Sequence, residues 1–274
     1  CLLSPDGRRV TFFTSLRQRK LKKTVVTIWQ VNADGTGLKS QILDFPINYT
    51  DLKLIAWPEG KDYLFMLLEE KSPTFKTLSN KLIRIDLGQK NYKVQVDNVK
   101  LSYYFSYPFF VSPRQDFMVL VYREKPENKD ILAVLNLKTL EKKEVHKADA
   151  LGLYTVKWNT NGDKILFSRF KETWIYSIPE DRARRISRRN YSYEIGFDWL
   201  LDGERIVLYT PAFEGDYFLK VLKEDFSEEK SIKIPFPIQK PVYIWGLKNK
   251  VLVRFHRGPL WRVDLETEKW KKIY

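Results

Sequence analysis

The sequence contains one cysteine, two histidines and two methionines among 274 residues, and each scarcity excludes a class of protein. A single cysteine excludes an intrachain disulfide framework. Two histidines are too few for a metal site built mainly from imidazole ligands. No stretch approaches the roughly 18 consecutive apolar residues of a membrane-spanning helix. The hydrophobic share of 43% nevertheless leaves ample apolar material for a core.

Signatures of catalysis are also missing. The sequence has no G-x-S-x-G elbow of a serine hydrolase and no glycine-rich phosphate loop before a helix. We therefore expect no catalytic residue, no cofactor and no metal. Paired acids of a carbohydrate-active enzyme stay open as an alternative. The acids that would supply such a pair are Asp51, Glu124, Asp149, Glu172, Glu194, Glu214 and Asp216.

The sequence contains an internal repeat instead of these signatures. Residues 2–15, 157–168 and 198–210 each contain an apolar residue, a polar turn centred on Asn-Gly or Asp-Gly, and a β-branched and aromatic run. This pattern predicts a β-hairpin, because Gly and Asn tolerate the positive φ of a tight turn. A second pair of short strands follows the first two hairpins and recurs near the end of the chain, so the repeating unit has four strands, A to D.

The unit recurs along the whole chain. The residues before the A to B turns are Leu3, Trp57, Val111, Trp158, Trp199 and Trp245, at intervals of 54, 54, 47, 41 and 46. A propeller blade spans roughly 40 to 50 residues. We predict an all-β, six-bladed β-propeller of four-stranded antiparallel blades, a single domain over residues 1–274. The predicted blades are residues 1–45, 46–98, 99–147, 148–188, 189–236 and 237–274. The alternative is a β-sandwich or a meander of hairpins.

The first repeat resembles a known family. Residues 4–10 (Ser-Pro-Asp-Gly-Arg-Arg-Val) and residues 28–37, which open on Ile-Trp-Gln-Val, look like the WD-related repeat of TolB-type propellers. The same repeat occurs in the propeller domains of prolyl-oligopeptidase-like peptidases. Later copies depart from the motif. Residues 112–113 match only its first two residues, Ser-Pro, and residues 159–162 match only its turn, through Asn-Gly. The resemblance implies the fold more than an activity, and it implies an exported bacterial protein of the periplasm or cell surface.

Long connections between strands are expected on one face of the propeller, where B to C and D to A loops emerge, at residues 14–25, 69–80, 97–106, 146–153, 187–194 and 211–217. Long loops on a rigid scaffold are where binding usually occurs. We predict binding by aromatic, imidazole and basic side chains of this face. They are Tyr103, Tyr104, Phe105, Tyr191, Tyr193, Tyr217, His146, His256, Arg17, Arg19, Lys20, Arg188 and Arg189. The alternative is that half of the rings pack under their own loops or between blades.

The net charge of +14 favours acidic partners. Two clusters, residues 17–23 and 182–189, carry much of the basic character; the alternative is that both are solvated loops or an edge strand kept soluble by charge. We expect a non-catalytic binding or scaffold protein that is monomeric and has a protein partner. An anionic glycan or other polyanion is the alternative partner, and we expect no nucleic acid partner.

Cys1 raises a further hypothesis, because many bacterial lipoproteins begin at a lipidated cysteine. A lipid at Cys1 would anchor the protein to a membrane. The alternative is that Cys1 is an ordinary residue of strand A, two positions before Leu3.

Overall fold

The computed structural model describes residues 1–4, 6–46, 49–58, 60–71, 77–89, 91–97, 109–124, 126–127, 129–149, 155–169, 172–188, 196–211, 216–223, 225–235, 242–255 and 258–273. In these ranges the regular structure consists of β-strands and one 3-10 turn, η1 (Arg19–Leu21). None of the described residues forms a helix with the length and apolarity needed to cross a bilayer. The predicted all-β class is confirmed.

The described strands form six four-stranded sheets in which strands consecutive in sequence pair side by side. Every pairing between these strands is antiparallel. The chain divides into two compact units, Cys1–Leu151 and Gly152–Tyr274, and each is described by itself. The four-stranded antiparallel unit predicted from the repeats is confirmed, whereas the blade boundaries stay a prediction.

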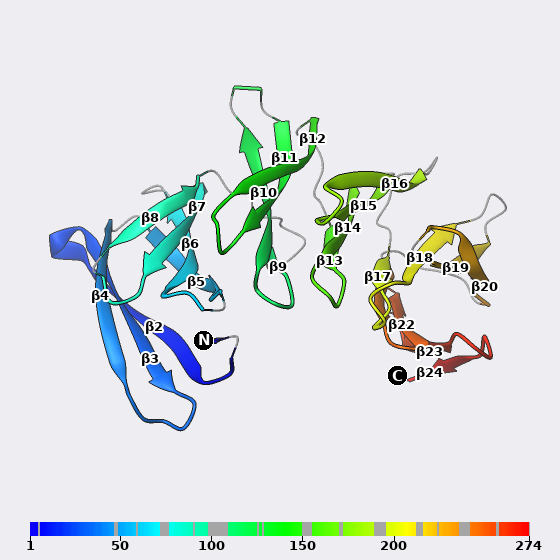
Figure 1. Cartoon of the computed structure of the whole chain (residues 1–274), viewed down its shortest axis with the longest axis horizontal. Coiled ribbons are helices and arrows are strands. Elements are labelled where there is room, and N and C mark those ends of the chain that lie inside the picture. Colours follow the sequence, from blue (N-terminus) through cyan, green and yellow to red (C-terminus); the bar gives the residue numbers. More distant parts are fainter. Residues whose placement is uncertain are drawn as a thin grey trace. The chain divides into compact units, whose positions relative to one another are not determined.

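The first unit holds sheets 1, 2 and 3, drawn from blue to green in Figure 1. Sheet 1 contains β1 (Leu2–Leu3), β2 (Arg9–Gln18), β3 (Lys23–Asn32) and β4 (Lys39–Pro46). Sheet 2 contains β5 (Tyr49–Ala56), β6 (Tyr63–Lys71), β7 (Thr77–Asp86) and β8 (Tyr92–Val96). Sheet 3 contains β9 (Phe109–Val111), β10 (Phe117–Glu124), β11 (Lys129–Asn136) and β12 (Lys142–Asp149).

The second unit holds sheets 4, 5 and 6, drawn from green to red in Figure 1. Sheet 4 contains β13 (Thr155–Trp158), β14 (Lys164–Arg169), β15 (Glu172–Ser177) and β16 (Arg182–Arg188). Sheet 5 contains β17 (Phe197–Trp199), β18 (Ile206–Pro211), β19 (Tyr217–Leu222) and β20 (Glu228–Lys233). Sheet 6 contains β21 (Val242–Gly246), β22 (Lys250–Phe255), β23 (Leu260–Asp264) and β24 (Trp270–Lys272).

Within each unit the sheets pack face to face, and alternate side chains of a central strand enter the cores on its two sides. Leu64, Met66 and Leu68 of β6 join a core with sheet 1, whereas Phe65 and Leu67 join a core with sheet 3. Successive side chains of a strand point to opposite faces, so a strand buried on both faces must be apolar at every position. This explains the unbroken run from Tyr63 to Leu68.

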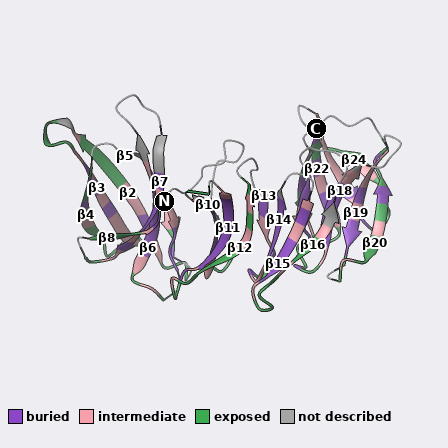
Figure 2. Cartoon of the chain, turned by 90° about the horizontal axis from the view of Figure 1, so that it is seen from above, coloured by how far each residue is buried: buried purple, intermediate pink, exposed green. Residues whose placement is uncertain are grey.

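Strand β18 shows the same division in the second unit. Ile206 and Leu208 pack toward sheet 4, and Val207 and Tyr209 pack toward sheet 6. In Figure 2 the buried residues lie mainly on the inner strands, and the outer strands β4 and β20 expose much of their length. Burial between neighbouring sheets therefore supplies most of the apolar core.

The A to B turns use the glycines that the repeats predicted. Gly7, Gly162 and Gly203 have φ of 69°, 73° and 78°, a backbone region that costs other residues free energy. The turn of sheet 3 has Gln115 at φ 54° instead. The turn chemistry predicted from Asp-Gly and Asn-Gly is thus confirmed where those dipeptides occur.

A buried polar residue begins three of these turns and holds them closed. The Ser4 and Ser112 hydroxyls accept the backbone N–H of Arg9 and Phe117, at 2.9 and 3.1 Å. Asn159 takes the same position in sheet 4, and its Oδ1 accepts the N–H of Lys164 at 3.0 Å. The Ser-Pro and Asn-Thr starts of the repeats are therefore structural, because each caps the amide that begins strand B.

We predict that Asn159→Ala lowers the free energy of unfolding by about 1–3 kcal/mol, because buried amides lose their acceptor. Asn159 is 1% exposed, accepts two backbone N–H groups and bonds the Asp163 carboxylate at 2.7 Å. Urea unfolding followed by tryptophan fluorescence measures the change. The control is Asn161→Ala at the exposed position of the same turn. Equal losses in the two variants would contradict the structural role of Asn159.

Candidate functional site

Several predicted site residues lie outside the described residues: Tyr103, Tyr104, Phe105, Arg189, Tyr191, Tyr193 and His256. Their role in binding stays a prediction. Arg19 and Arg188 are placed by their backbone only, in η1 and at the end of β16. The described members of the set are Arg17, Lys20, His146 and Tyr217, with Cys1 as the predicted anchor.

The loop predicted over residues 146–153 is wrong for its first part. His146 lies in β12, opposite Leu132 and next to a register shift between Leu132 and Ala133. It is half-buried in the outer strand of sheet 3. The sequence of β12 does not predict a strand, because the extra residue of a bulge breaks the two-residue alternation of side chains that marks a strand.

Tyr217 begins β19 and is part of the core. Its ring stacks on Tyr209 with centroids 5.5 Å apart and an interplanar angle of 11°. It packs against the core shared by sheets 5 and 6. This is the outcome that the alternative allowed, in which rings assigned to the loop face pack under their own loops or between blades.

The loop predicted over residues 14–25 is also wrong over most of its length. Strand β2 continues to Gln18, β3 starts at Lys23, and only η1 and Lys22 connect them. We name residues 14–25 the basic hairpin. The first basic cluster therefore lies at the closed end of a pair of strands, with Arg17 and Lys23 on the strands and Arg19, Lys20 and Lys22 in the short connection.

The basic hairpin presents cations beside exposed leucines. Arg17, Lys20 and Lys22 are exposed, and Leu16 and Leu21 are 63% and 65% exposed. No acidic residue occurs from residue 14 to 25. Where β3 begins, the Lys23 ammonium pairs with the Asp44 carboxylate at 2.7 Å. The tip is therefore a cationic surface with an apolar component, suited to an anionic partner that also offers apolar contacts.

The second basic cluster forms β16, the outer strand of sheet 4. Arg184 pairs with Glu180 at 3.1 Å, and Arg185 pairs with Glu172 at 2.8 Å. The Arg185 guanidinium also lies over the Trp174 ring, 5.9 Å from its centroid. The edge-strand interpretation of this cluster is confirmed, because charged side chains are the usual protection of an exposed edge.

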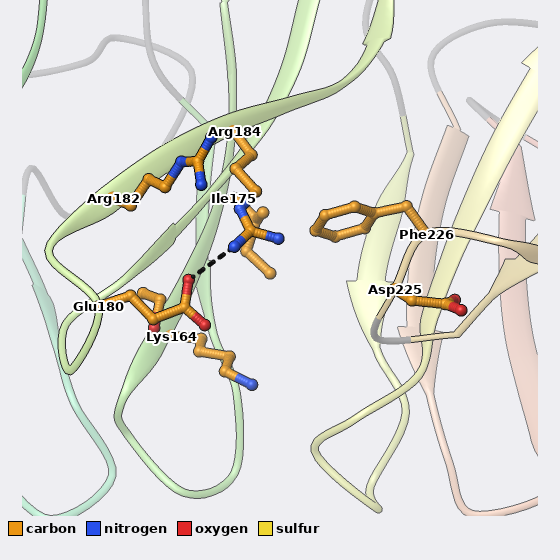
Figure 3. A pocket seen from close by; sticks show the side chains of 8 residues that line it. Lys164, Ile175, Glu180, Arg182, Arg184, Asp225 and Phe226 are labelled. Carbon is orange, nitrogen blue, oxygen red and sulfur yellow. Dashed lines mark hydrogen bonds and ion pairs between the residues drawn. The ribbon is translucent and has the colours of Figure 1, made fainter.

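A pocket of about 330 Å³ lies between sheets 4 and 5 (Figure 3). It is lined by Lys164, Ile175, Ser177, Glu180, Arg182, Arg184, Asp225 and Phe226. The Arg184 to Glu180 ion pair lies on one side, and the Phe226 ring faces it from the turn before β20. No ion pair joins Arg182 to another described residue. The pocket can accept a small anionic group beside an apolar wall.

Asp198 of β17 is a mostly buried carboxylate between β13 and β21. Its side chain is 17% exposed, and Oδ2 lies 3.7 Å from the Lys157 ammonium. It accepts the backbone N–H groups of Trp199 and Gly246 at 3.0 and 3.2 Å. Burial raises the pKa of Asp198 above its ordinary value, and Lys157 opposes that shift only in part. These contacts join the first strands of sheets 4, 5 and 6.

The described residues contain no cluster of three or more His, Cys, Asp or Glu side chains able to hold a metal ion. Asp198 itself is held by an ammonium and two amides, which is a structural arrangement.

Sheets 1 and 6 each carry apolar side chains on the face turned away from the neighbouring sheet of their own unit. On the face of sheet 1 turned away from sheet 2, Leu3, Leu16 and Ile42 are exposed. On the face of sheet 6 turned away from sheet 5, Tyr243 and Trp245 stack with ring centroids 6.3 Å apart. Trp245 is 39% exposed, unlike the buried anchors Trp57 and Trp199.

Comparison with known proteins gives one curated relative and a set of solved structures. A Tricorn protease homolog of Saccharolobus solfataricus is 31% identical over 111 residues, which are 40% of this chain and 10% of that protein. The chain therefore spans a tenth of the length of this relative. No family model matches the chain.

The β-propeller domain of the trilobed protease from Pyrococcus furiosus aligns with a TM-score of 0.54 and 13% identity, over 82% of this chain and 72% of that chain. Prolyl oligopeptidase B from Galerina marginata aligns with a TM-score of 0.55 and 11% identity, over all of this chain and 41% of the enzyme. The chain has a β-propeller fold. At these identities the likeness establishes the propeller fold and no activity.

TolB from Acinetobacter baumannii also aligns, over 96% of this propeller chain and 63% of that chain, with 14% identity and a TM-score of 0.43. The resemblance predicted from residues 4–10 and 28–37 is confirmed for the propeller domains of peptidases. The predicted alternative of a two-sheet sandwich does not fit six four-stranded sheets.

We predict that raising the pH above about 4 lowers the free energy of unfolding of the wild type but not that of an Asp198→Asn variant, when the two are compared. Because the native pKa of Asp198 is raised, the folded state binds more protons than the unfolded state between the ordinary and the native pKa. The wild type therefore loses stability across that window, and the variant does not. Urea unfolding of both proteins from pH 3 to about pH 7 measures the difference.

Asp34→Asn is the control with the opposite sign. Hydrogen bonds from Thr36 lower the pKa of Asp34, so its stabilising effect is present at neutral pH and is lost as pH falls below about 4. If the wild type instead gained stability over Asp198→Asn on going from acid to neutral pH, the raised pKa of Asp198 would be wrong.

Proposed function

We propose that the six sheets are the six blades of one propeller that acts as a non-catalytic binding module for a protein partner with an acidic surface. The observation that carries the proposal is the basic hairpin. It holds Arg17 on β2 and Lys20 and Lys22 in the short connection to β3, all three exposed, with Leu16 and Leu21 beside them and no acid among them. A rigid cationic surface of this kind speeds encounter with an acidic partner and fixes its orientation.

The pocket between sheets 4 and 5 supports the same class of partner. Arg182 and the Phe226 ring offer an anionic side chain and its apolar stem complementary contacts. We keep Tyr103, Tyr104, Phe105, Tyr191, Tyr193, His146, His256, Arg188 and Arg189 as proposed partner contacts. Tyr217 is better assigned to the core, because it stacks on Tyr209.

The non-catalytic part of the proposal is supported by alignment with a structure that is itself the β-propeller domain of a protease. It is also supported by the ion-pairing chemistry of the described surface. We further propose an extracytoplasmic location in a bacterium and a lipid anchor at Cys1, whose side chain is exposed. Metabolic labelling of the natural protein with a radioactive fatty acid tests the anchor, and a Cys1→Ala protein that keeps the label refutes it.

A polyanion such as an acidic glycan is the second candidate, favoured by the density of cations in the basic hairpin. Protein and polyanion partners differ in how binding responds to salt. Binding to a polyanion rests on charge alone and weakens steeply as salt rises, whereas a protein partner also contacts Leu16 and Leu21 and keeps part of its affinity.

We predict that the triple variant Arg17→Gln, Lys20→Gln, Lys22→Gln binds the partner about tenfold more weakly at low salt. The partner is first captured from an envelope fraction on immobilised wild-type protein, then purified and titrated by calorimetry. Loss of three cations from one surface reduces both encounter rate and affinity. The sequence of the captured protein shows whether its surface is acidic.

The matched control removes three exposed cations from sheet 6: Lys248→Gln, Lys269→Gln and Lys271→Gln. It has the same net charge as the test variant. Equal weakening in both variants would mean that only net charge matters, and would contradict the role of the basic hairpin. Retention on an immobilised anionic polysaccharide that disappears by about 0.3 M salt, without a protein partner, would favour the second candidate.

A further inference from the structure

The pocket between sheets 4 and 5 is lined by two cross-strand rows of side chains on one face of sheet 4. In the register of β14, β15 and β16, Lys164, Ser177 and Arg182 lie side by side. We name these three residues the polar row. The next row places Ile175 beside Arg184. Residues two apart on a strand share a face, and Ile175 packs in the core with sheet 5. Both rows therefore face sheet 5.

Ser177 places a buried hydroxyl at the centre of the polar row. The residue is 7% exposed, and its side chain makes no hydrogen bond to another described residue. A buried hydroxyl without a partner costs free energy that a ligand can recover by supplying one. Adjacent strands lie about 4.8 Å apart, so Lys164 and Arg182 flank any group that is bound at this hydroxyl. The polar row is therefore arranged to hold an anion.

The charge balance of the pocket favours an anion with a single charge. Of its three cations, Arg184 already pairs with Glu180 at 3.1 Å. The Asp225 carboxylate is hydrogen-bonded within its own turn and keeps its negative charge near the pocket. Lys164 and Arg182 thus exceed Asp225 by one charge. A second negative charge on the ligand would face two acids of the lining and be repelled. A carboxylate fits this balance better than a phosphate group.

The Phe226 ring lines the pocket from a turn position where a side chain is disfavoured. Phe226 has φ of 69°, in the left-handed region that a bulky residue rarely adopts. The turn of sheet 1 with the same two backbone hydrogen bonds has Gly35 at this position. The ring packs on the core of sheets 4 and 5 and points toward Ile175 and Arg184 (Figure 3). Sheet 5 therefore holds a fixed aromatic wall where sheet 1 has a glycine.

The volume of the pocket limits the ligand to a small group. At about 330 Å³ the pocket lies at the lower end of ligand sites, which span about 300–1,000 Å³. One water molecule takes about 30 Å³ in the liquid, so the pocket holds about ten non-hydrogen atoms. A carboxylate joined to one aromatic ring or one branched chain has this size.

We propose that this pocket binds a monocarboxylate joined to one apolar group, with the carboxylate on the polar row and the apolar group against Phe226 and Ile175. Two sources offer this chemistry: a small free acid, and the carboxyl terminus of a protein chain that ends in an apolar residue. For the second source the inference rests on the proposed function, because the chain end then belongs to the partner. For the first source the pocket is a separate ligand site.

The test follows the backbone amides of the full chain by NMR during titration. The ligands are phenylacetate, acetate, inorganic phosphate, and the peptide acetyl-Gly-Phe with either a free carboxylate or an amide at its end. We expect phenylacetate to bind about tenfold more tightly than acetate or phosphate, with shifts at Ser177, Arg182 and Phe226. A free peptide that binds about tenfold more tightly than its amide identifies a chain end as the source. Binding of phenylacetate without binding of either peptide identifies a free acid.

Arg182→Gln and Arg185→Gln are a matched pair on β16. They remove the same charge from opposite faces of one strand, and Arg185 pairs with Glu172 away from the pocket. We expect Arg182→Gln to bind phenylacetate about tenfold more weakly, and Arg185→Gln to bind it within about twofold of the wild type. Ser177→Ala deletes only the hydroxyl and should also weaken binding about tenfold.

Phe226→Gly tests the apolar wall without straining the turn, because Gly35 has φ of 84° at the corresponding position. We expect this variant to bind phenylacetate about tenfold more weakly, since the ring of the ligand loses its apolar contact. Acetate has no apolar group of that size and should bind within about twofold of its wild-type affinity.

Equal weakening of phenylacetate binding by Arg182→Gln and Arg185→Gln would overturn the proposal. Tighter binding of phosphate than of phenylacetate, or no shift in the polar row, would do the same. If no carboxylate bound while the Arg17, Lys20, Lys22 variant still lost the natural partner, the carboxylate site would fail and the proposed function would stand.

Discussion

Burial of sheet faces between neighbouring sheets is the constraint on which this propeller depends. A four-stranded sheet whose central strand is apolar at every position, as β6 is from Tyr63 to Leu68, has no stable solvent-exposed face. It requires a neighbour on each side, and the neighbour has the same requirement. Repetition of the four-strand unit follows from this need. Each copy needs apolar side chains on the faces that its neighbours cover. The sequence therefore repeats the same apolar pattern in every copy, which a single meander of alternating strands would not require.

Stacking of this kind brings the first strands of successive sheets close together, and polar groups there need internal partners. Within sheets 4 to 6, Asp198 accepts the amides of Trp199 and Gly246 and lies near Lys157, while the Trp199 indole donates to the Lys157 carbonyl. Gly246 has no room for a Cβ, because the Trp199 carbonyl oxygen occupies that space. The anchor tryptophan predicted from the repeats thus works together with a carboxylate and a glycine that the repeats did not single out.

The sequence predicted the turns well because their chemistry is local. Gly7, Gly162 and Gly203 have the positive φ that their dipeptides require, and that requirement involves only neighbouring residues. Strand ends were predicted poorly where pairing is not local. Residues 14–25 are rich in Lys and Arg, which have little β propensity, and only the ten-residue register between β2 and β3 makes them strand. His146 was assigned to a loop for a similar reason, since a bulge shifts β12 against β11. The pocket beside Phe226 joins two sheets and has no signature in either repeat.

The basic hairpin differs from the other charged parts of the described surface in what surrounds its cations. On β16 two of the arginines are balanced by acids of their own sheet, with Arg184 on Glu180 and Arg185 on Glu172. Such pairs contribute little to binding, because a partner would have to displace an acid already in place. Along the basic hairpin, Lys23 alone among the described cations has such an acid, Asp44. The exposed cations at its tip, beside two exposed leucines, can meet a partner without first breaking an ion pair. Uncompensated charge, rather than charge itself, therefore distinguishes the surface that is available for recognition.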